Sequence, residues 1–318
     1  MSIIVYAESW EGKFRKSTFE AISYAKKISE GLQKDVKSIC VGSINEDELK
    51  KLGDYGSSSV DVYPNISKSD CKSVAEVINE HSQEANFIIF SNTFNAKSIA
   101  PRVSAKLSAG LVSNVISNLE DVNSPTFKRQ SFSSKAIETV KLNTKQAVIS
   151  IAPNSFELVQ VNTDCTINMN QKNFDSDLTV ISKEVNKGKI SLSEAEIVVS
   201  AGRGLKGPEN WEMIESLADI LGAATACSKP VSDIGWRPHS EHVGQTGKAV
   251  APNLYIAIGI SGAIQHLAGV NSSKIMVAIN TDPEAPFFKA ADYGIVGDAF
   301  DVVPKLNEKL KAFKAGNN

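Results

Sequence analysis

The sequence has no cluster of cysteines of the kind found in metal-binding or redox-active proteins. Its four cysteines, Cys40, Cys71, Cys165 and Cys227, share no short spacing with one another or with the four histidines. A zinc site or a thioredoxin-like pair needs such a spacing. We therefore expect reduced cysteines in or near the core and no metal site.

Excess charge and long apolar runs are also absent. The formal net charge of -2 gives no support to nucleic-acid binding or to docking on an anionic membrane. No apolar run approaches the roughly 20 residues of a membrane span, and the chain starts directly with a predicted strand rather than a signal peptide. We expect a cytoplasmic bacterial protein that is not an integral membrane protein.

What is present is an ordinary globular composition and a length that suggests about two domains. In the first half, short apolar segments alternate with helical patterns, which predicts a parallel α/β sheet covered on both faces. The expected strands span residues 2–7, 36–41, 59–62 and 87–91, and the expected helices lie near residues 46–51, 70–82 and 96–107.

Three further segments complete this reading. Ser17 and Glu20 have the spacing of a capping box, which predicts a helix that starts there. Extended segments over residues 136–142 and 145–151 predict an antiparallel extension of the sheet. The polar, charged stretch 170–193 has no clear period and predicts a linker. We expect an N-terminal domain over residues 1–190 and a doubly wound α/β domain over residues 191–318.

A strand, a glycine loop and a helix follow one another at the start of the second domain. The loop Gly202-Arg203-Gly204-Leu205-Lys206-Gly207 has the letters of the dinucleotide fingerprint. A nicotinamide site also needs an acidic residue at the end of the next strand, about 20 residues further on; the chain there reads Ala224-Thr225-Ala226-Cys227-Ser228-Lys229, and the next acid is Asp233. An NAD-binding enzyme built on residues 202–207 is therefore an alternative, not the preferred reading.

A second glycine pattern, Val243-Gly244-Gln245-Thr246-Gly247-Lys248, is similar to a phosphate-binding loop but departs from it. His242 stands where that loop needs a glycine, and Ala249 stands where it needs serine or threonine. We therefore exclude nucleoside triphosphate hydrolysis.

The most informative stretch is residues 254–266, which read Leu-Tyr-Ile-Ala-Ile-Gly-Ile-Ser-Gly-Ala-Ile-Gln-His. Its first half is apolar and typical of a buried strand, and at Ser261-Gly262 it turns into a predicted helix. Ligands bind at such strand ends in open α/β sheets. Gln265 and His266 lie near the start of this helix and would present a cation or a hydrogen-bond donor.

Read in order with residues 243–248, 279–286 and 291–298, this stretch closely resembles the electron transfer flavoprotein α subunit family, whose large subunit carries FAD. The resemblance is nearly continuous from residue 198 to residue 303. No nucleophile and base stand out by spacing, which suits an electron carrier with no catalytic residue of its own.

The resemblance implies FAD-binding residues position by position. Arg203, Ser228 and Lys229 would contact FAD, Thr246 would bond the flavin near N5, and His266 would face the pyrimidine end of the ring. Gln245, Ser261 and Gln265 would bind the ribityl chain and phosphates, and Asn280 and Asp298 the adenosine end. The remaining members of the implied site are Val243, Gly244, Gly247, Gly262, Ala263 and Ile264.

Two positions depart from the family, and at one of them His242 stands where the family often has glutamine. Lys229 replaces an arginine that commonly stacks on the flavin, so we expect the ring to be held less rigidly.

The resemblance also implies partners. The chain would pair with a smaller β subunit that binds AMP, the N-terminal domain serving as heterodimer scaffold. The complex would shuttle electrons from flavin dehydrogenases, such as the acyl-CoA dehydrogenases of fatty acid oxidation, to a membrane quinone oxidoreductase. Two alternatives stay open beside the NAD-binding enzyme: a bifurcating subunit that oxidises NADH with a second flavin on its partner, and a cofactor-free scaffold.

Overall fold

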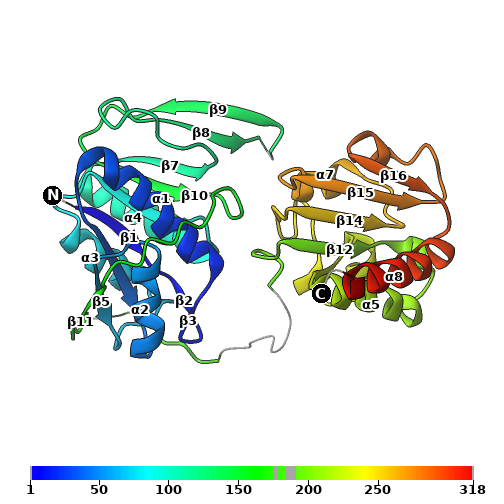
Figure 1. Ribbon diagram of the computed structural model, residues 1–318, viewed down its shortest axis with the longest axis horizontal. Helices are drawn as coiled ribbons and strands as arrows, with labels where there is room; N and C mark the ends of the chain where they lie inside the picture. Colours follow the sequence, from blue (N-terminus) through cyan, green and yellow to red (C-terminus); the bar gives the residue numbers. More distant parts are fainter. Residues whose placement is uncertain (1, 133, 175, 177, 183–190, 317–318) are drawn as a thin grey trace. The chain divides into compact units, whose positions relative to one another are not determined.

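The computed structural model describes residues 2–132, 134–174, 176, 178–182 and 191–316. The chain divides into two compact units (Figure 1). Unit 1 comprises residues 1–131 and 137–184, and unit 2 comprises residues 132–136 and 185–318. The predicted charged linker run 183–189 and the predicted domain boundary after residue 190 fall on residues outside the described ranges.

Unit 1 alternates strands and helices before it turns to strands alone. Its elements are β1 (Ile3–Tyr6), β2 (Ser9–Trp10), β3 (Lys13–Phe14), α1 (Lys16–Leu32), β4 (Val36–Val41), α2 (Glu46–Asp54), β5 (Ser59–Tyr63), α3 (Cys71–His81), β6 (Phe87–Ser91), α4 (Phe94–Leu107), β7 (Gly110–Val115), β8 (Thr126–Ser131), β9 (Ala136–Lys141), β10 (Ala147–Ile151) and β11 (Thr166–Met169).

The sheet of unit 1 has the strand order β11-β5-β4-β1-β6-β10-β7-β8-β9. The strands from β11 to β7 pair in parallel, and β8 adds to β7 in the antiparallel direction. The predicted antiparallel extension is confirmed where β8 adds to β7, and the predicted extended segment 136–142 forms the edge strand β9 beside β8. The prediction was wrong for residues 147–151, because β10 inserts in parallel between β6 and β7 and is buried throughout.

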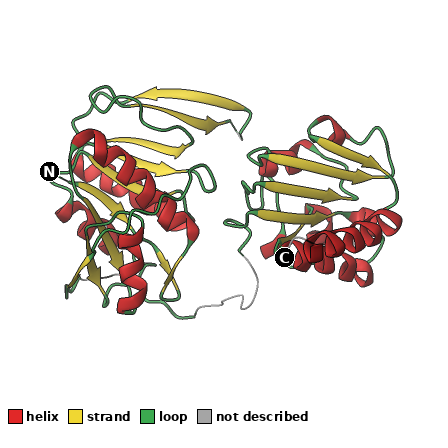
Figure 2. Ribbon diagram, viewed as in Figure 1, coloured by secondary structure: helices red, strands yellow, loops and turns green. Residues whose placement is uncertain are grey.

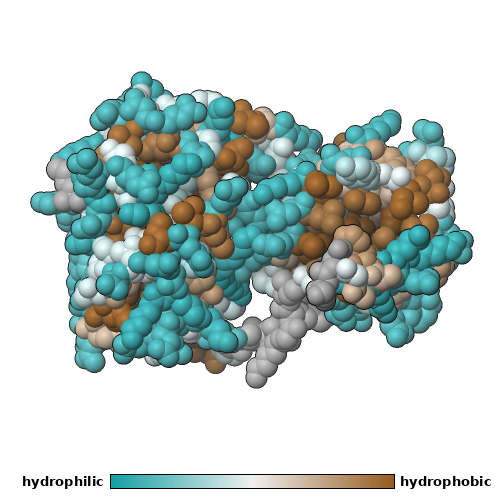
Figure 3. Space-filling view, in the orientation of Figure 1, coloured by the Kyte–Doolittle hydropathy of each residue, from teal (hydrophilic) through white to brown (hydrophobic). Residues whose placement is uncertain are grey.

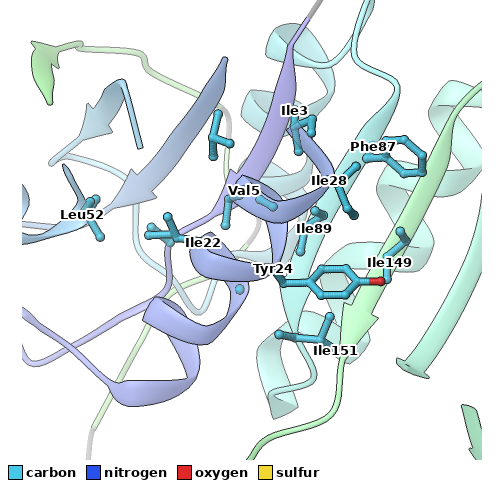
Figure 4. Close-up of a cluster of buried hydrophobic side chains, with 14 of the residues drawn as sticks. Ile3, Val5, Ile22, Tyr24, Ile28, Leu52, Phe87, Ile89, Ile149 and Ile151 are labelled. Atoms are coloured by element: carbon cyan, nitrogen blue, oxygen red, sulfur yellow. The ribbon is translucent and has the colours of Figure 1, made fainter. Parts of the chain in front are cut away.

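Both faces of this sheet are covered by helices, as predicted. On one face Ile3 and Val5 pack with Ile22 of α1 and Leu52 of α2, in the cluster drawn in Figure 4. On the other face the alternate strand residues pack with helices α3 and α4, through side chains such as Val74 and Ile99. The alternation follows because successive strand side chains point to opposite faces.

The start of α1 corrects the predicted capping box. The helix begins at Lys16, its N-cap is Arg15, and no side chain caps it. Ser17 is thus already inside the helix. Glu20 is buried and its carboxylate accepts a hydrogen bond from the backbone N–H of Asn154, at 3.0 Å, in the loop that follows β10.

Unit 2 is a doubly wound α/β unit, as predicted (Figure 2). Its elements are β12 (Ile197–Ala201), η1 (Arg203–Leu205), η2 (Pro208–Trp211), α5 (Glu212–Leu221), β13 (Ala224–Cys227), α6 (Lys229–Asp233), η3 (His239–Glu241), β14 (Leu254–Ile258), α7 (Ile264–Val270), β15 (Ile275–Asn280), η4 (Pro286–Lys289), β16 (Tyr293–Val296) and α8 (Ala299–Gly316). All strand pairs in the order β13-β12-β14-β15-β16 are parallel.

The helices of unit 2 lie on both faces of its sheet. Ile214 of α5 and Val303 of α8 pack on the face that carries Val199 and Ile256. Val270 of α7 packs on the opposite face with Tyr255. None of the helices in the described ranges has the length and apolar content that a membrane crossing requires.

Candidate functional site

The crevice at the carboxyl end of the unit 2 sheet is set by the strand order. After β12 the chain passes to α5 on one face, and after the neighbouring strand β14 it passes to α7 on the other. Adjacent strands whose helices leave in opposite directions open a crevice outside their carboxyl ends, where α/β proteins bind ligands. Residues 202–207 and 259–263 are the two loops that border it.

The glycines of the first loop serve the crossing of these two loops. A Cβ on Gly202 would lie 2.3 Å from the carbonyl oxygen of Gly259, and a Cβ on Gly204 would lie 2.6 Å from the Cα of Gly259. Gly259 itself has a φ of +60°, in the left-handed region that favours glycine. The fingerprint letters at Gly202 and Gly204 are thus explained by contact between two backbones, and they require no pyrophosphate.

The turn over residues 243–248 is tied to the same edge of the sheet. The N–H of Val243 donates to the carbonyl of Cys227 at the end of β13, at 3.1 Å, and the N–H of Gln245 donates to the carbonyl of Gln265 in α7, at 2.7 Å. The second predicted motif therefore joins the residues that follow β13 and β14. The Val243 side chain lies in the core, so only its backbone is available to a ligand.

The predicted residues with accessible side chains come from separate segments of this edge. Exposed side chains are those of Arg203 after β12, Lys229 after β13, Gln245 and Thr246 in the turn, and Ser261, Ala263, Ile264 and Gln265 after β14. Ser228 lies beside Lys229 but is buried, with 7% of its surface exposed.

His266 differs from the prediction that it presents a cation. Its side chain is 6% exposed, and its Nε2 lies 2.9 Å from the hydroxyl of Tyr255. Burial, reinforced by the neighbouring His242, lowers the pKa of His266 to about 4, while the backbone of Val243 acts in the opposite direction. His266 is therefore neutral at pH 7 and can act only as a donor or acceptor. Its Nδ1 is buried and has no hydrogen-bond partner.

Asn280 and Asp298 both have structural partners. The Asn280 amide donates to the carbonyl of Ile260, at 3.1 Å, and so braces the loop after β14. The Asp298 carboxylate accepts from the N–H of Phe300, which lowers its pKa, and lies 3.4 Å from the Lys206 ammonium. Asn280 ends β15 and Asp298 follows β16, and both polar atoms of each side chain already have a hydrogen-bond partner within the protein.

Sequence reasoning missed the residues that support this edge from beneath. Gly262 has a φ of +88°, and a Cβ there would lie 2.4 Å from the backbone nitrogen of Phe287, so η4 closes on the loop after β14. Phe287 stacks with Tyr255, with ring centroids 6.3 Å apart. Phe287 directly follows the compared segment 279–286, but nothing in its spacing indicates this packing.

A buried ion pair fixes the segment between β13 and the turn. The Arg237 guanidinium donates twice to the Glu241 carboxylate, at 2.7 and 2.8 Å, and contacts Glu215 of α5 at 3.0 Å. The Arg237 and Glu241 side chains are only 14% and 8% exposed. This clamp anchors η3, which leads directly into His242 and the turn.

The comparisons with known proteins agree with this arrangement. Residues 3–176 match the electron transfer flavoprotein domain, and residues 191–271 match the electron transfer flavoprotein FAD-binding domain. The chain is 37% identical over 318 residues to the electron transfer flavoprotein subunit alpha of Bacillus subtilis, and 97% of each chain is covered. The chain belongs to the electron transfer flavoprotein family. It is also 37% identical to the alpha subunit of Pseudomonas aeruginosa, over 98% of this chain and 100% of that one.

A third electron transfer flavoprotein relative, the mitochondrial alpha subunit of Dictyostelium discoideum, is again 37% identical over 98% of this chain and 92% of its own length. The FAD-binding domain covers β12 to α7, and so includes the crevice and the turn.

The residues at the crevice suit a flavin nucleotide. Residues 202–207, 228–232, 243–248 and 259–266 contain no carboxylate, and they carry four cationic side chains, those of Arg203, Lys206, Lys229 and Lys248. Such a set complements a pyrophosphate, and the amide and hydroxyl groups of Gln245, Thr246 and Gln265 complement the polar edge of an isoalloxazine ring. At the end of β13, where a nicotinamide site places its carboxylate, the chain has Cys227, Ser228 and Lys229.

Proposed function

We propose that this electron transfer flavoprotein alpha subunit carries FAD at the carboxyl edge of unit 2 and shuttles electrons between flavin dehydrogenases and a membrane quinone oxidoreductase. The observation that carries the proposal is the convergence of four separate segments, residues 202–207, 228–232, 243–248 and 259–266, on one edge of the sheet, and none of these segments contains a carboxylate. The match of residues 191–271 to an FAD-binding domain supports it.

Each segment would hold a different part of the cofactor. Arg203 and Lys229 would bind as cations, and Gln245, Ser261 and Gln265 would bind the ribityl chain and phosphates. Thr246 would donate near the flavin N5, with Ser228 beside the ring. When bound, FAD supplies the electron transfer itself, so the residues of the chain bind, orient and tune it.

Neutral His266 would supply a fixed donor near the pyrimidine end of the flavin. Because its ring is buried and bonded to Tyr255, it needs no reorganisation when charge develops on a ligand beside it. The remaining predicted contacts, at Gly244, Gly247, Gly262 and the adenosine-side residues Asn280 and Asp298, complete the proposed site.

We infer a heterodimer with a β subunit that binds AMP. Unit 2 exposes apolar side chains at the edge strand of its sheet, which the register places on one face: Ile275 is 42% exposed, Tyr293 66% and Ile295 41%. Hydrophobic residues also gather over the face of unit 2 that is turned to the viewer in Figure 3. Contiguous apolar surface of this kind is typical of a subunit interface.

The proposed donors include acyl-CoA dehydrogenases, which would place the complex in fatty acid oxidation. A cytoplasmic location is proposed from the bacterial relatives, and the mitochondrial relative shows that the family is not confined to one compartment.

The test is to co-express the chain with its β subunit and to determine the visible spectrum and flavin content of the purified complex. One FAD per alpha chain, lost on Arg203→Ala and retained on Arg102→Ala in helix α4 of unit 1, would support the proposal. A colourless complex that FAD cannot reconstitute would overturn it. Two flavins per heterodimer would instead indicate the bifurcating branch.

Lys229→Arg is expected to slow release of FAD, because a planar guanidinium stacks better than an ammonium.

A further inference from the structure

His242 occupies an unusual place for a titratable group, directly beneath the turn that carries Gln245 and Thr246. Its side chain is 6% exposed. Its backbone N–H donates to the carbonyl of His239, at 3.1 Å, and its carbonyl accepts from the N–H of Lys248, at 2.9 Å. The turn over residues 243–248 therefore leaves from His242 and closes back onto it.

The imidazole ring lies against the backbone of both glycines in the turn. A Cβ on Gly247 would lie 2.8 Å from the ring Nδ1 and 2.9 Å from Cε1, and a Cβ on Gly244 would lie 3.4 Å from Nε2. Gly247 is thus required, because a side chain there would clash with both the His242 carbonyl, at 2.5 Å, and the ring, whereas the ring is only in ordinary contact with Gly244, whose φ of +151° itself favours glycine. Since Gln245 and Thr246 stand between these glycines, the ring helps to determine where their side chains point.

The charged groups around the ring favour its neutral form. Burial lowers the pKa of His242, the Lys229 ammonium of α6 and His239 of η3 lower it further, and only Asp233 of α6 raises it. On the other elements packed here, the Cys227 thiol of β13 has a pKa raised to about 12 by burial, and the Glu241 carboxylate is engaged by Arg237. Lys248, at the end of the turn, contacts His242 through its backbone N–H, and its side chain is exposed.

The second imidazole of the edge is coupled to the first. His242 contributes to the lowered pKa of His266, which stays neutral down to about pH 4. Above that pH, His242 is therefore the ring of this pair that takes up a proton. A charged His242 needs water or an acceptor at both nitrogens, and both face glycine backbone in the neutral arrangement.

We propose that His242 is a positioning residue that makes retention of FAD depend on pH: the neutral ring supports the turn over residues 243–248, and protonation drives the ring out and displaces Gln245 and Thr246. This inference rests on the proposed FAD function. Bound FAD would cover the turn and shield the ring further from water, so one proton taken up at His242 opposes one FAD bound.

The test is the pH dependence of FAD affinity in the complex with the β subunit, measured by fluorescence titration from pH 8 to pH 5. The wild-type dissociation constant should rise by about tenfold per pH unit once His242 begins to titrate, which is the slope of a single linked proton. His242→Gln cannot be protonated, so its dissociation constant, whatever its absolute value, should stay the same from pH 8 to pH 5, and His242→Asn serves if the glutamine variant does not fold.

His239→Gln is the matched control, because it makes the same change on an exposed ring of the adjoining η3. It should keep the wild-type slope, shifted to slightly higher pH, since His239 lowers the pKa of His242. Equal slopes in the wild type and His242→Gln, or an affinity that rises as the pH falls, would overturn the inference while leaving the proposed function intact. Failure of every protein to bind FAD at pH 8 would overturn both.

Discussion

The burial of His266 predicts that the stability of unit 2 falls in mild acid. Its pKa of about 4 lies below the ordinary value of 6.5 because burial disfavours the charged ring. Between these two pH values, His266 is therefore protonated in the unfolded chain and neutral in the folded chain. Stability is unaffected by this group above pH 6.5 and declines as the pH falls toward 4.

The size of the effect follows from the shift. A lowering of about 2.5 pKa units at about 1.4 kcal/mol each amounts to ~3 kcal/mol, lost progressively across this window. That is a large part of the 5–15 kcal/mol stability of an ordinary domain, roughly speaking. His266→Gln, which retains a polar group toward Tyr255 but cannot be protonated, should remove the dependence.

The assay is urea unfolding at a series of pH values, followed by tryptophan fluorescence. Of the three tryptophans only Trp10 belongs to unit 1, so a Trp10→Phe background leaves Trp211 and Trp236 to report on unit 2. The wild type should lose about 3 kcal/mol more than His266→Gln between pH 6.5 and pH 4. His239→Gln, the change of an exposed ring, should follow the wild type. Parallel curves for the wild type and His266→Gln would refute the reasoning.

Three further perturbations have expected outcomes that thermal or urea unfolding checks. Gly204→Ala should destabilise unit 2 by about 1–3 kcal/mol, because its Cβ would lie 2.6 Å from the Cα of Gly259. Gly316→Ala, which has open space around it, should leave the stability unchanged. Equal effects of the two substitutions would contradict this explanation. Arg237→Met should cost about 3–5 kcal/mol because it removes the cation that pairs with the buried Glu241 carboxylate, and Lys50→Ala in the exposed Glu46–Lys50 pair should leave the melting temperature unchanged. Glu8→Ala should cost unit 1 about 1–3 kcal/mol by leaving Thr93 and Asn95 without their acceptor, and a shift of the Trp211 and Trp236 transition instead would contradict that assignment.

The layout of both sheets was predictable because buried parallel strands leave continuous apolar runs in the sequence. The strands over residues 36–41 and 87–91 agree with the structure to the residue. Residues 147–151 have the same apolar signature, yet their place between β6 and β7 depends on pairings such as Ala147 with Phe87 and Ala147 with Gly110, which are 60 and 37 residues apart in the sequence. Local pattern does not encode such pairings, and this is why the predicted antiparallel role of this segment was wrong.

In the candidate site, too, the sequence predicted which segments take part but not how their side chains pack. Recognition of motifs in a fixed order indicated which segments meet at the edge of unit 2, and the structure brings together those that follow β12, β13 and β14. It did not indicate the charge of His266, because that charge depends on burial by Tyr255 and Phe287. Nor did it indicate the ring of His242 beneath the turn. The protonation state of a residue depends on the groups packed around it, and the spacing of residues in the sequence does not describe those groups.

The two carboxyl edges explain why only unit 2 is a plausible cofactor carrier, although both units are parallel α/β sheets. In unit 1 the loops after the strands are held by the protein's own buried carboxylates: Glu8 accepts from Asn95 at 2.7 Å, and Glu20 accepts from the backbone of Asn154. A phosphate brought to that edge would meet fixed negative charge and donors that are already satisfied. In unit 2 the segments 202–207 and 228–232, which follow β12 and β13, contain no carboxylate and carry Arg203 and Lys229 in exposed positions. The loops at the carboxyl edge of unit 1 therefore bind to one another, whereas those of unit 2 can bind an anionic nucleotide.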